Sequence, residues 1–398
     1  MKKETRLTGH YTGIQIGYWA AMAVFNSLYV PILRSRGFDG SEISILLALR
    51  YGFVIAAQPV LASFADKHAK TIPLKYLVVG INITGLVASV LFAVLRPGAI
   101  GTGILIAVTG CAMGLLVSFN DSLAMQYVNQ GIMINYSFAR AFGSVAFAVS
   151  SLCLGFLIEG FGIECAPYAQ VIILSVKLLI VLTFQKCEVK TEKAVKKQVH
   201  SAGYLLKNYS EFTIFLVAVL FLYVGNVMYL NFVVDMVGQL GGNSTNLGII
   251  HFVMSVSELP LAFTIAKIRK KISNKILLVI STVFIVMRMV LVMGATSLFM
   301  LTIVQVLNML GFGIYFSSSV LFVNEIIPKE DQVKGQSLMG IASSAGLAGM
   351  IGSLGSGQLS AAFGVNAVMQ AVVGCMIAGM TAMIIAVLVN RRKNRYKK

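Results

Sequence analysis

Long apolar runs limit this chain to a small number of folds. Stretches of about 20 apolar residues recur from end to end, and a helix of that length spans the hydrocarbon core of a bilayer. The runs show no alternation of period two, so they are not the strands of a membrane barrel. Because every backbone polar group must be satisfied within lipid, helices are the remaining solution. The sequence therefore predicts an all-α membrane protein.

We count twelve such runs, and a mean hydropathy of +0.84 agrees with a chain that lies mostly in lipid. The first run is too long for a cleavable signal peptide and has no small-residue cleavage site. We therefore predict twelve transmembrane helices, at residues 12–34, 41–64, 73–95, 100–127, 136–158, 165–184, 211–235, 246–266, 276–294, 297–322, 337–362 and 366–390.

The two halves of the chain resemble each other at an offset of about 200 residues. Pro59-Val-Leu-Ala in the second span matches Pro260-Leu-Ala-Phe in the eighth, and residues 155–162 in the fifth match residues 357–364 in the eleventh. Repeated bundles of this kind place a substrate site near mid-membrane between the repeats. We predict two six-helix bundles, at residues 1–185 and 211–398, joined by a cytoplasmic linker at residues 186–210; the second bundle ends in a basic cytoplasmic tail.

The net charge of +17 is explained by topology. Most of the 32 Lys and Arg residues lie at the two ends of the chain and in alternate loops, whereas the other loops hold only Arg34, Arg36 and Arg96. Such asymmetry is typical of the positive-inside rule and predicts that both termini are cytoplasmic. We therefore expect a multi-pass protein of a prokaryotic cytoplasmic (inner) membrane that contacts membrane lipid and no nucleic acid.

One pair of opposite charges is expected deep in the second half. The stretch from Asn246 to Gly294 is predicted as two apolar helices around a basic loop, with Glu258 in the first and Arg288 in the second. Counted from that loop at about 1.5 Å per residue, they lie roughly 12 Å and 19 Å deep, a gap of about 7 Å that an arginine can span. Ionised groups at such depth usually find a partner. We interpret the pair as a proton-coupling ion pair; the alternative is a purely structural pair.

A second pair is expected in the first half. Asp121 in the fourth span and Arg140 in the fifth lie about 13 Å and 7 Å from their shared inner loop. A guanidinium group binds carboxylates or sugar hydroxyls with two parallel hydrogen bonds. We predict substrate binding at this pair, with structural pairing as the alternative. Lys177, in the middle of the sixth span, is predicted to balance Asp121 or to attract an anionic substrate.

Further side chains complete the predicted sites. His251 lies two helical turns before Glu258 and is predicted as a proton relay, with a satisfied interfacial histidine as the alternative. Aromatic faces and amides suit sugar or nucleobase rings, although each such residue is also ordinary bundle filler. The predicted substrate-lining set is Trp19, Asn26, Phe147, Asn226, Tyr229 and Asn308.

In these patterns the chain resembles the major facilitator superfamily, and within it the branch of lactose permease and the phenylpropionate and nucleoside proton symporters. The residues from Gln58 to Lys67 resemble the end of its second span and its signature loop. The segment from Tyr136 to Ser144 is similar to the fifth span, where the family keeps a substrate-contacting arginine. Ser257-Glu258-Leu-Pro260, followed by Arg288, resembles its ion pair of spans 8 and 9. The resemblance implies a two-bundle fold and proton coupling.

The chain also departs from that branch. Lactose permease has a histidine and a glutamate in span 10 where this chain has Asn308 and Gly311, so that proton-release group is not carried over. Phe147 stands where lactose permease stacks a sugar on tryptophan, so galactoside specificity does not follow. The signature loop has Lys67-His68-Ala69-Lys70 without the usual glycine.

These observations predict a secondary active transporter, a proton-coupled symporter that imports a sugar or nucleoside by alternating access. A proton-driven exporter of drugs or metabolites is the alternative, and sodium coupling is a variant. The sequence has no GxxxxGK[ST], HExxH or GxSxG motif, so we expect neither an ATP-driven pump nor an enzyme. The five cysteines lack metal-ligand spacing. We expect a monomer that needs no cofactor and binds a small-molecule substrate together with a proton.

Overall fold

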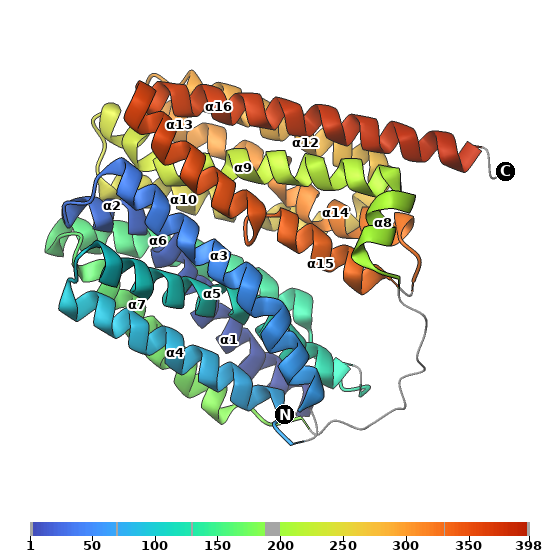
Figure 1. Ribbon diagram of the computed structural model, residues 1–398, viewed down its shortest axis with the longest axis horizontal. Helices are drawn as coiled ribbons and strands as arrows, with labels where there is room; N and C mark the ends of the chain where they lie inside the picture. Colours follow the sequence, from blue (N-terminus) through green and yellow to red (C-terminus); the bar gives the residue numbers. More distant parts are fainter. Residues whose placement is uncertain (1–2, 69–70, 129, 188–199, 330, 396–398) are drawn as a thin grey trace. The chain divides into compact units, whose positions relative to one another are not determined.

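Helices make up the folded part of the chain in the computed structural model, which describes residues 3–68, 71–128, 130–187, 200–329 and 331–395 (Figure 1). The described residues contain no strand. The helices of the first half are α1 (Lys3–Ser27), α2 (Tyr29–Ser35), α3 (Gly40–Lys67), α4 (Leu74–Leu95), α5 (Ala99–Val128), α6 (Tyr136–Phe161) and α7 (Cys165–Thr183).

The second half begins with a short helix inside the predicted linker. Residues 188–199 of that linker lie outside the described part of the chain. Its helices are α8 (Ala202–Asn208), α9 (Ser210–Gln239), α10 (Ser244–Val256), α11 (Leu259–Arg269), α12 (Asn274–Met293), α13 (Leu298–Ile303), the 3-10 helix η1 (Val304–Met309), α14 (Phe312–Ile326), α15 (Gln332–Ala342) and α16 (Leu347–Arg395).

The predicted all-α membrane fold is confirmed. Nine stretches of the described chain are helical, long and apolar enough to cross a membrane, or ten when the bent pair α1 and α2 counts as one span. One stretch, Gln332–Val389, covers two predicted spans, and within it Gly364 has a non-helical φ of 79°. The eighth predicted span is divided into α10 and α11, each shorter than a span. Each of the twelve predicted spans therefore has a helical counterpart when α1 with α2 counts as one span, Gln332–Val389 as two and α10 with α11 as one.

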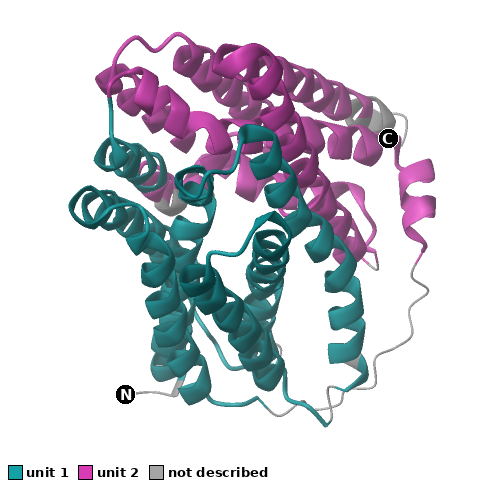
Figure 2. Ribbon diagram, turned by 60° about the vertical axis from the view of Figure 1, so that its left-hand side comes forward, with its two compact units in different colours: residues 1–194, 242–256 teal, residues 195–241, 257–398 magenta. Residues whose placement is uncertain are grey.

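The chain separates into two compact units (Figure 2). Unit 1 contains residues 1–194 and 242–256, and unit 2 contains residues 195–241 and 257–398. The second stretch of unit 1 is α10, which follows α9 in the sequence but packs against α6. The predicted division into bundles at residues 1–185 and 211–398 stays a prediction.

Close helix packing in unit 1 depends on small residues. A Cβ at Gly248 of α10 would lie 2.6 Å from the carbonyl oxygen of Ser151, and one at Gly155 of α6 would lie 2.8 Å from that of Ser244. Facing glycines let two helix backbones approach where larger side chains would hold them apart. The contact between α6 and α10 is therefore a backbone-to-backbone contact.

An ion-pair network joins three helix ends at one side of unit 1. Arg36, after α2, donates to the Glu164 carboxylate at 2.9 Å and to the carbonyl of Phe92 in α4 at 2.8 Å. Arg96, after α4, approaches the same carboxylate at 3.5 Å. The Arg36 guanidinium holds the pKa of Glu164 below its usual range. The basic residues of the predicted outer loops thus tie the ends of α2 and α4 to the start of α7.

Unit 2 is organised around α9, which packs along α16 (Figure 1). A Cβ at Gly352 of α16 would lie 2.9 Å from the carbonyl oxygen of Val224, so α9 and α16 also meet at their backbones. The start of α15 is held by the end of the linker: Asp331 accepts from the backbone N–H of His200 at 2.9 Å and from its Nδ1 at 2.7 Å. These hydrogen bonds hold the pKa of Asp331 below its usual range.

Candidate functional site

In unit 1, three neutral donors surround the Asp121 carboxylate of α5. Oδ1 accepts from the Tyr11 hydroxyl and from Gln15 Nε2, both at 3.2 Å, and Oδ2 accepts from the Tyr136 hydroxyl at 3.1 Å. Gln15 Nε2 also lies 2.6 Å from the Tyr11 hydroxyl. We call these four residues the Asp121 cluster. All three donors are neutral, and among the described residues no cation forms an ion pair with this carboxylate.

Arg140 of α6 does not pair directly with Asp121, although the two charges interact electrostatically. Its guanidinium carbon lies 4.0 Å from the centre of the Trp19 ring, and its Nη1 donates to the Ser144 hydroxyl at 3.1 Å. Trp19 Nε1 in turn donates to Gln15 Oε1 at 3.1 Å. The predicted pair is therefore linked indirectly, through Trp19 and Gln15.

Lys177 of α7 is fully buried and lies in the packing between helices. Its Nζ donates to Asn82 Oδ1 of α4 at 2.9 Å and lies 5.4 Å from the centre of the Tyr18 ring. A Cβ at Gly17 of α1 would lie 2.8 Å from the Lys177 Cβ. The lysine is thus enclosed by α1 and α4, with an amide as its hydrogen-bond partner.

Sequence reasoning predicted Trp19 of α1 but missed Tyr11 and Gln15. Tyr11, Gln15 and Trp19 recur at a spacing of four residues, which places them on one face of a helix. The structure joins this face to Asp121 and Arg140, and it adds Tyr136 and Ser144 from α6. The four-residue spacing was visible in the sequence and was the signal for Tyr11 and Gln15.

In unit 2, Asn308 connects the predicted ion pair. Its Oδ1 accepts from Arg288 Nη1, and its Nδ2 donates to Glu258 Oε1 at 2.5 Å. Arg288 is 1% exposed, and its guanidinium carbon lies 5.5 Å from the Tyr229 ring and 5.9 Å from the Phe312 ring. We call Glu258, Asn308 and Arg288 the charge bridge. It places an amide, which both donates and accepts, between opposite charges.

Two interruptions of regular helix position the charge bridge. Glu258 precedes the first turn of α11, where Pro260 has no N–H to donate to the carbonyl of Val256 and so favours the break after α10. Asn308 lies in the 3-10 helix η1, between α13 and α14. A 3-10 stretch within a span often marks a hinge or a functional position. The sequence predicted unbroken helices at both places.

His251 and Glu258, predicted on one continuous helix, belong to different helical segments. It lies in α10 of unit 1, 1% exposed, with its ring centre 6.4 Å from that of Phe147 in α6. Neither of its ring nitrogens has a hydrogen-bond partner among the described residues. A break at Ser257 and Glu258 separates its helix from α11. Its predicted role in proton relay stays a prediction.

The remaining predicted substrate residues occupy different environments. Tyr229 of α9 is fully buried beside Arg288, whereas Asn26 of α1 and Asn226 of α9 are half-buried. The structure joins Tyr229, but neither of the two asparagines, to the clusters described above.

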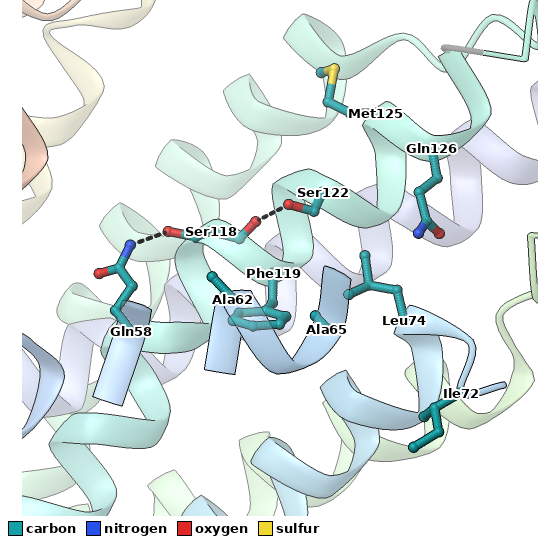
Figure 3. Close-up of a pocket in the computed structure, with 10 residues that line it drawn as sticks. All are labelled: Gln58, Ala62, Ala65, Ile72, Leu74, Ser118, Phe119, Ser122, Met125 and Gln126. Atoms are coloured by element: carbon teal, nitrogen blue, oxygen red, sulfur yellow. Dashed lines mark hydrogen bonds between the residues drawn. The ribbon is translucent and has the colours of Figure 1, made fainter. Parts of the chain in front are cut away.

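A separate cavity of about 330 Å³ lies between α3, α5 and the turn before α4 (Figure 3). Gln58 Nε2 donates to the Ser118 hydroxyl at 3.2 Å across it, and Ser122 donates to the Ser118 carbonyl at 2.8 Å. Its lining has no charged side chain and none of the predicted site residues. We therefore assign the candidate site to the Asp121 cluster with Arg140 and Trp19, and to the charge bridge.

Comparison with known proteins gives a family match over most of the chain. The sequence model of the MFS_1 like family matches residues 11–371. Among curated proteins, the uncharacterized transporter YwbF of Bacillus subtilis is 22% identical over 327 residues, which cover 80% of this chain and 79% of YwbF. The maltose permease of Geobacillus stearothermophilus is 26% identical over 250 residues, or 61% of this chain and 60% of that protein.

Solved structures show the same fold. Two crystal structures of the nucleoside transporter NupG superpose with TM-scores of 0.80 and 0.79, at 14% and 17% sequence identity. Each match covers 96% of this chain and nearly all of NupG. At these sequence identities the superposition shows a shared fold and nothing about the solute.

Proposed function

The chain is a member of the MFS_1 like family, and from that premise we propose that it is a proton-coupled symporter that imports a sugar or a nucleoside by alternating access. Membership makes it a multi-pass membrane transporter of small solutes and not an enzyme. The resemblance to the major facilitator superfamily is thereby confirmed. Proton coupling, import and the class of solute are the proposal.

The charge bridge supports proton coupling. Glu258 supplies the carboxylate of the charge bridge. Arg288 is buried on all sides, and the negative charge of Glu258 offsets its positive charge. When Glu258 is ionised, the pair is electrically balanced through Asn308. When it takes up a proton, Arg288 keeps a charge without compensation in apolar surroundings, which is costly. Proton uptake would therefore favour a conformation in which Arg288 finds other partners or water.

The Asp121 cluster supports solute binding. It presents hydroxyl and amide groups beside the indole ring of Trp19. Polar groups of this kind recognise sugar hydroxyls, and aromatic faces stack against sugar or nucleobase rings. Of the similar proteins reported above, maltose permease is named for a sugar and NupG for nucleosides. We propose a sugar or nucleoside for this chain on that basis.

The test is uptake into proteoliposomes that contain the purified full-length protein. A pH gradient, acidic outside, should drive accumulation of labelled sugar or nucleoside, and a protonophore should abolish it. Glu258→Gln should reduce gradient-driven accumulation at least about tenfold, equivalent to roughly 1.4 kcal/mol of lost coupling, while solute exchange at equal concentrations persists. Glu159→Gln, at an exposed carboxylate of α6, is the matched control and should accumulate solute normally.

Accumulation that survives the protonophore, or that is equal in Glu258→Gln and the native protein, would refute proton coupling through Glu258. Accumulation only in everted vesicles would refute import and favour the exporter. Replacing sodium by choline in the same assay separates the two coupling ions.

A further inference from the structure

Resting on the transport function proposed above, we infer that the solute carries an oxyanion, a carboxylate or a phosphate group, which Arg140 binds. The guanidinium of Arg140 is held by two contacts. It lies against the Trp19 ring at 4.0 Å and donates one hydrogen bond, to the Ser144 hydroxyl at 3.1 Å. Stacking and hydrogen bonding together fix its plane, so its donors are positioned before a ligand arrives.

Most of the donors of Arg140 are unused. A guanidinium group has five N–H donors, and Ser144 takes one of them. Among the described residues, no carboxylate lies within 4.0 Å of Arg140. Each side-chain nitrogen of Arg140 either has a hydrogen-bond partner or is reached by solvent. The open edge of the guanidinium is therefore accessible to solvent and ready for a planar or tetrahedral oxyanion.

Asp121, the carboxylate predicted to neutralise Arg140, has other partners. Both of its oxygens accept from neutral groups of the Asp121 cluster, at 3.1 to 3.2 Å. A carboxylate whose acceptor sites are already satisfied gains less from moving to a cation. The structure thus frees Arg140 for a ligand instead of pairing it internally.

The balance of charge inside unit 1 also favours an anion. Away from the ends of the first six predicted spans, the chain carries Arg50, Arg140 and Lys177 against the single carboxylate of Asp121. Arg50 is held by aromatic rings and by the carbonyl of Phe25, and Lys177 by an amide. No acidic side chain of the described residues pairs with either. An excess of positive charge within the spans raises the affinity of the region for anions.

Gly143 is the residue that permits this arrangement. A Cβ at Gly143 would lie 2.4 Å from Cδ1 of Trp19, so the indole lies directly against the backbone of α6. Any side chain at this position would displace the ring on which the guanidinium stacks. We therefore assign Gly143 as a positioning residue for Arg140, three residues away on the same helix.

The experiment compares neutral solutes with their acidic counterparts on the purified full-length protein. The probes are D-glucose, D-glucuronate and D-glucose 6-phosphate, and uridine with uridine 5′-monophosphate. Binding is read as a shift in Tm and as Kd by isothermal titration calorimetry. We expect an acidic member to raise Tm and its neutral counterpart to do so much less. The carboxylate and phosphate arms identify which oxyanion is recognised.

Variants test the role of Arg140. Arg140→Gln should weaken binding of the acidic solute by roughly 30-fold or more, because a charged hydrogen-bonding partner is lost. Arg140→Lys keeps the positive charge but lacks the planar set of donors of a guanidinium group, so it should give an intermediate Kd. Gly143→Ala should displace Trp19 and weaken binding of the acidic solute by a larger factor than binding of its neutral counterpart, because the acid loses the positioned guanidinium as well as the ring. Arg96→Gln, at an exposed arginine outside the spans, is the control and should bind normally.

The inference is overturned if no acidic member raises Tm, if neutral members bind as tightly as their acidic counterparts, or if Arg140→Gln leaves the Kd of the acid unchanged. The matched solutes decide this on the native protein even if a variant fails to fold. Tight, Arg140-dependent binding of an acid that no proton gradient accumulates would refute the proposed symport and leave this inference intact. Gradient-driven uptake of neutral solutes alone would support the proposed symport and refute binding of an oxyanion by Arg140.

Discussion

At the scale of single residues, both clusters use neutral polar groups where opposite charges were expected to meet. Asn308 stands between Glu258 and Arg288, and Gln15 and Trp19 stand between Asp121 and Arg140. An amide between two charges satisfies a donor and an acceptor at once and leaves both charged groups free to change partner. Directly paired ions in apolar surroundings are strongly destabilised when one partner is removed. Neutral mediators suit groups that must change state during a transport cycle.

Asn308→Leu should therefore destabilise the protein and uncouple proton uptake. It removes the acceptor of the buried Arg288 Nη1, which costs about 1–3 kcal/mol, and it removes the amide that donates to Glu258. We expect a lower Tm in detergent and a loss of gradient-driven accumulation. Asn208→Leu, at an exposed asparagine of α8, is the matched control and should leave both unchanged. An unchanged Tm in Asn308→Leu would show that Asn308 does not connect the two charges.

At the scale of elements, α10 is the helix whose packing differs most from its place in the sequence. Its contacts place it in unit 1, where Gly248 of α10 faces Gly155 of α6. The next helix, α11, belongs to unit 2. The chain passes between the units at the break after Val256, next to Glu258. Under the proposed proton coupling, we expect protonation of Glu258 to shift α10, because helix ends are where backbone angles change most easily.

Gly248→Ala should weaken the contact between α6 and α10. The new Cβ would lie 2.6 Å from the Ser151 carbonyl oxygen, so a backbone must shift, and overpacking of this kind costs about 1–3 kcal/mol. A fall in Tm of the purified protein measures the effect. Gly160→Ala is the control: it lies on α6 with no atom within 4 Å of its Cβ position, so its Tm should stay the same or rise. Equal effects of the two substitutions would contradict a close backbone contact.

At the scale of the whole molecule, the topology proposed from basic residues is testable without knowledge of the solute. The loops of the described chain place Gly98 and Lys271 in exposed turns that should lie on opposite sides of the membrane. In a variant without the five native cysteines, a membrane-impermeant maleimide added to intact cells should label Gly98→Cys and not Lys271→Cys. Permeabilised cells, in which both label, provide the control. The reverse pattern would place the termini outside.

Much of the fold was predictable because lipid leaves a spanning chain few choices. The spans, their helical character and the alternation of basic loops follow from local sequence, since each is set by hydropathy over about 20 residues. Local pattern did not predict the interruptions at Glu258 and Asn308. A proline or a glycine is compatible with either a kinked or a continuous helix in a bundle, and the neighbouring helices decide between them.

Hydropathy and charge along the chain were enough to predict an all-helical membrane transporter and to identify the spans that carry charge, because the cost of placing charge and backbone in hydrocarbon applies residue by residue. The contacts of each charge followed from the packing of the helices: Asp121 contacts Tyr11, Gln15 and Tyr136, Arg140 contacts Trp19, and Glu258 contacts Asn308. Those partners come from other helices, and helix rotation and depth are set by packing, which no single span encodes.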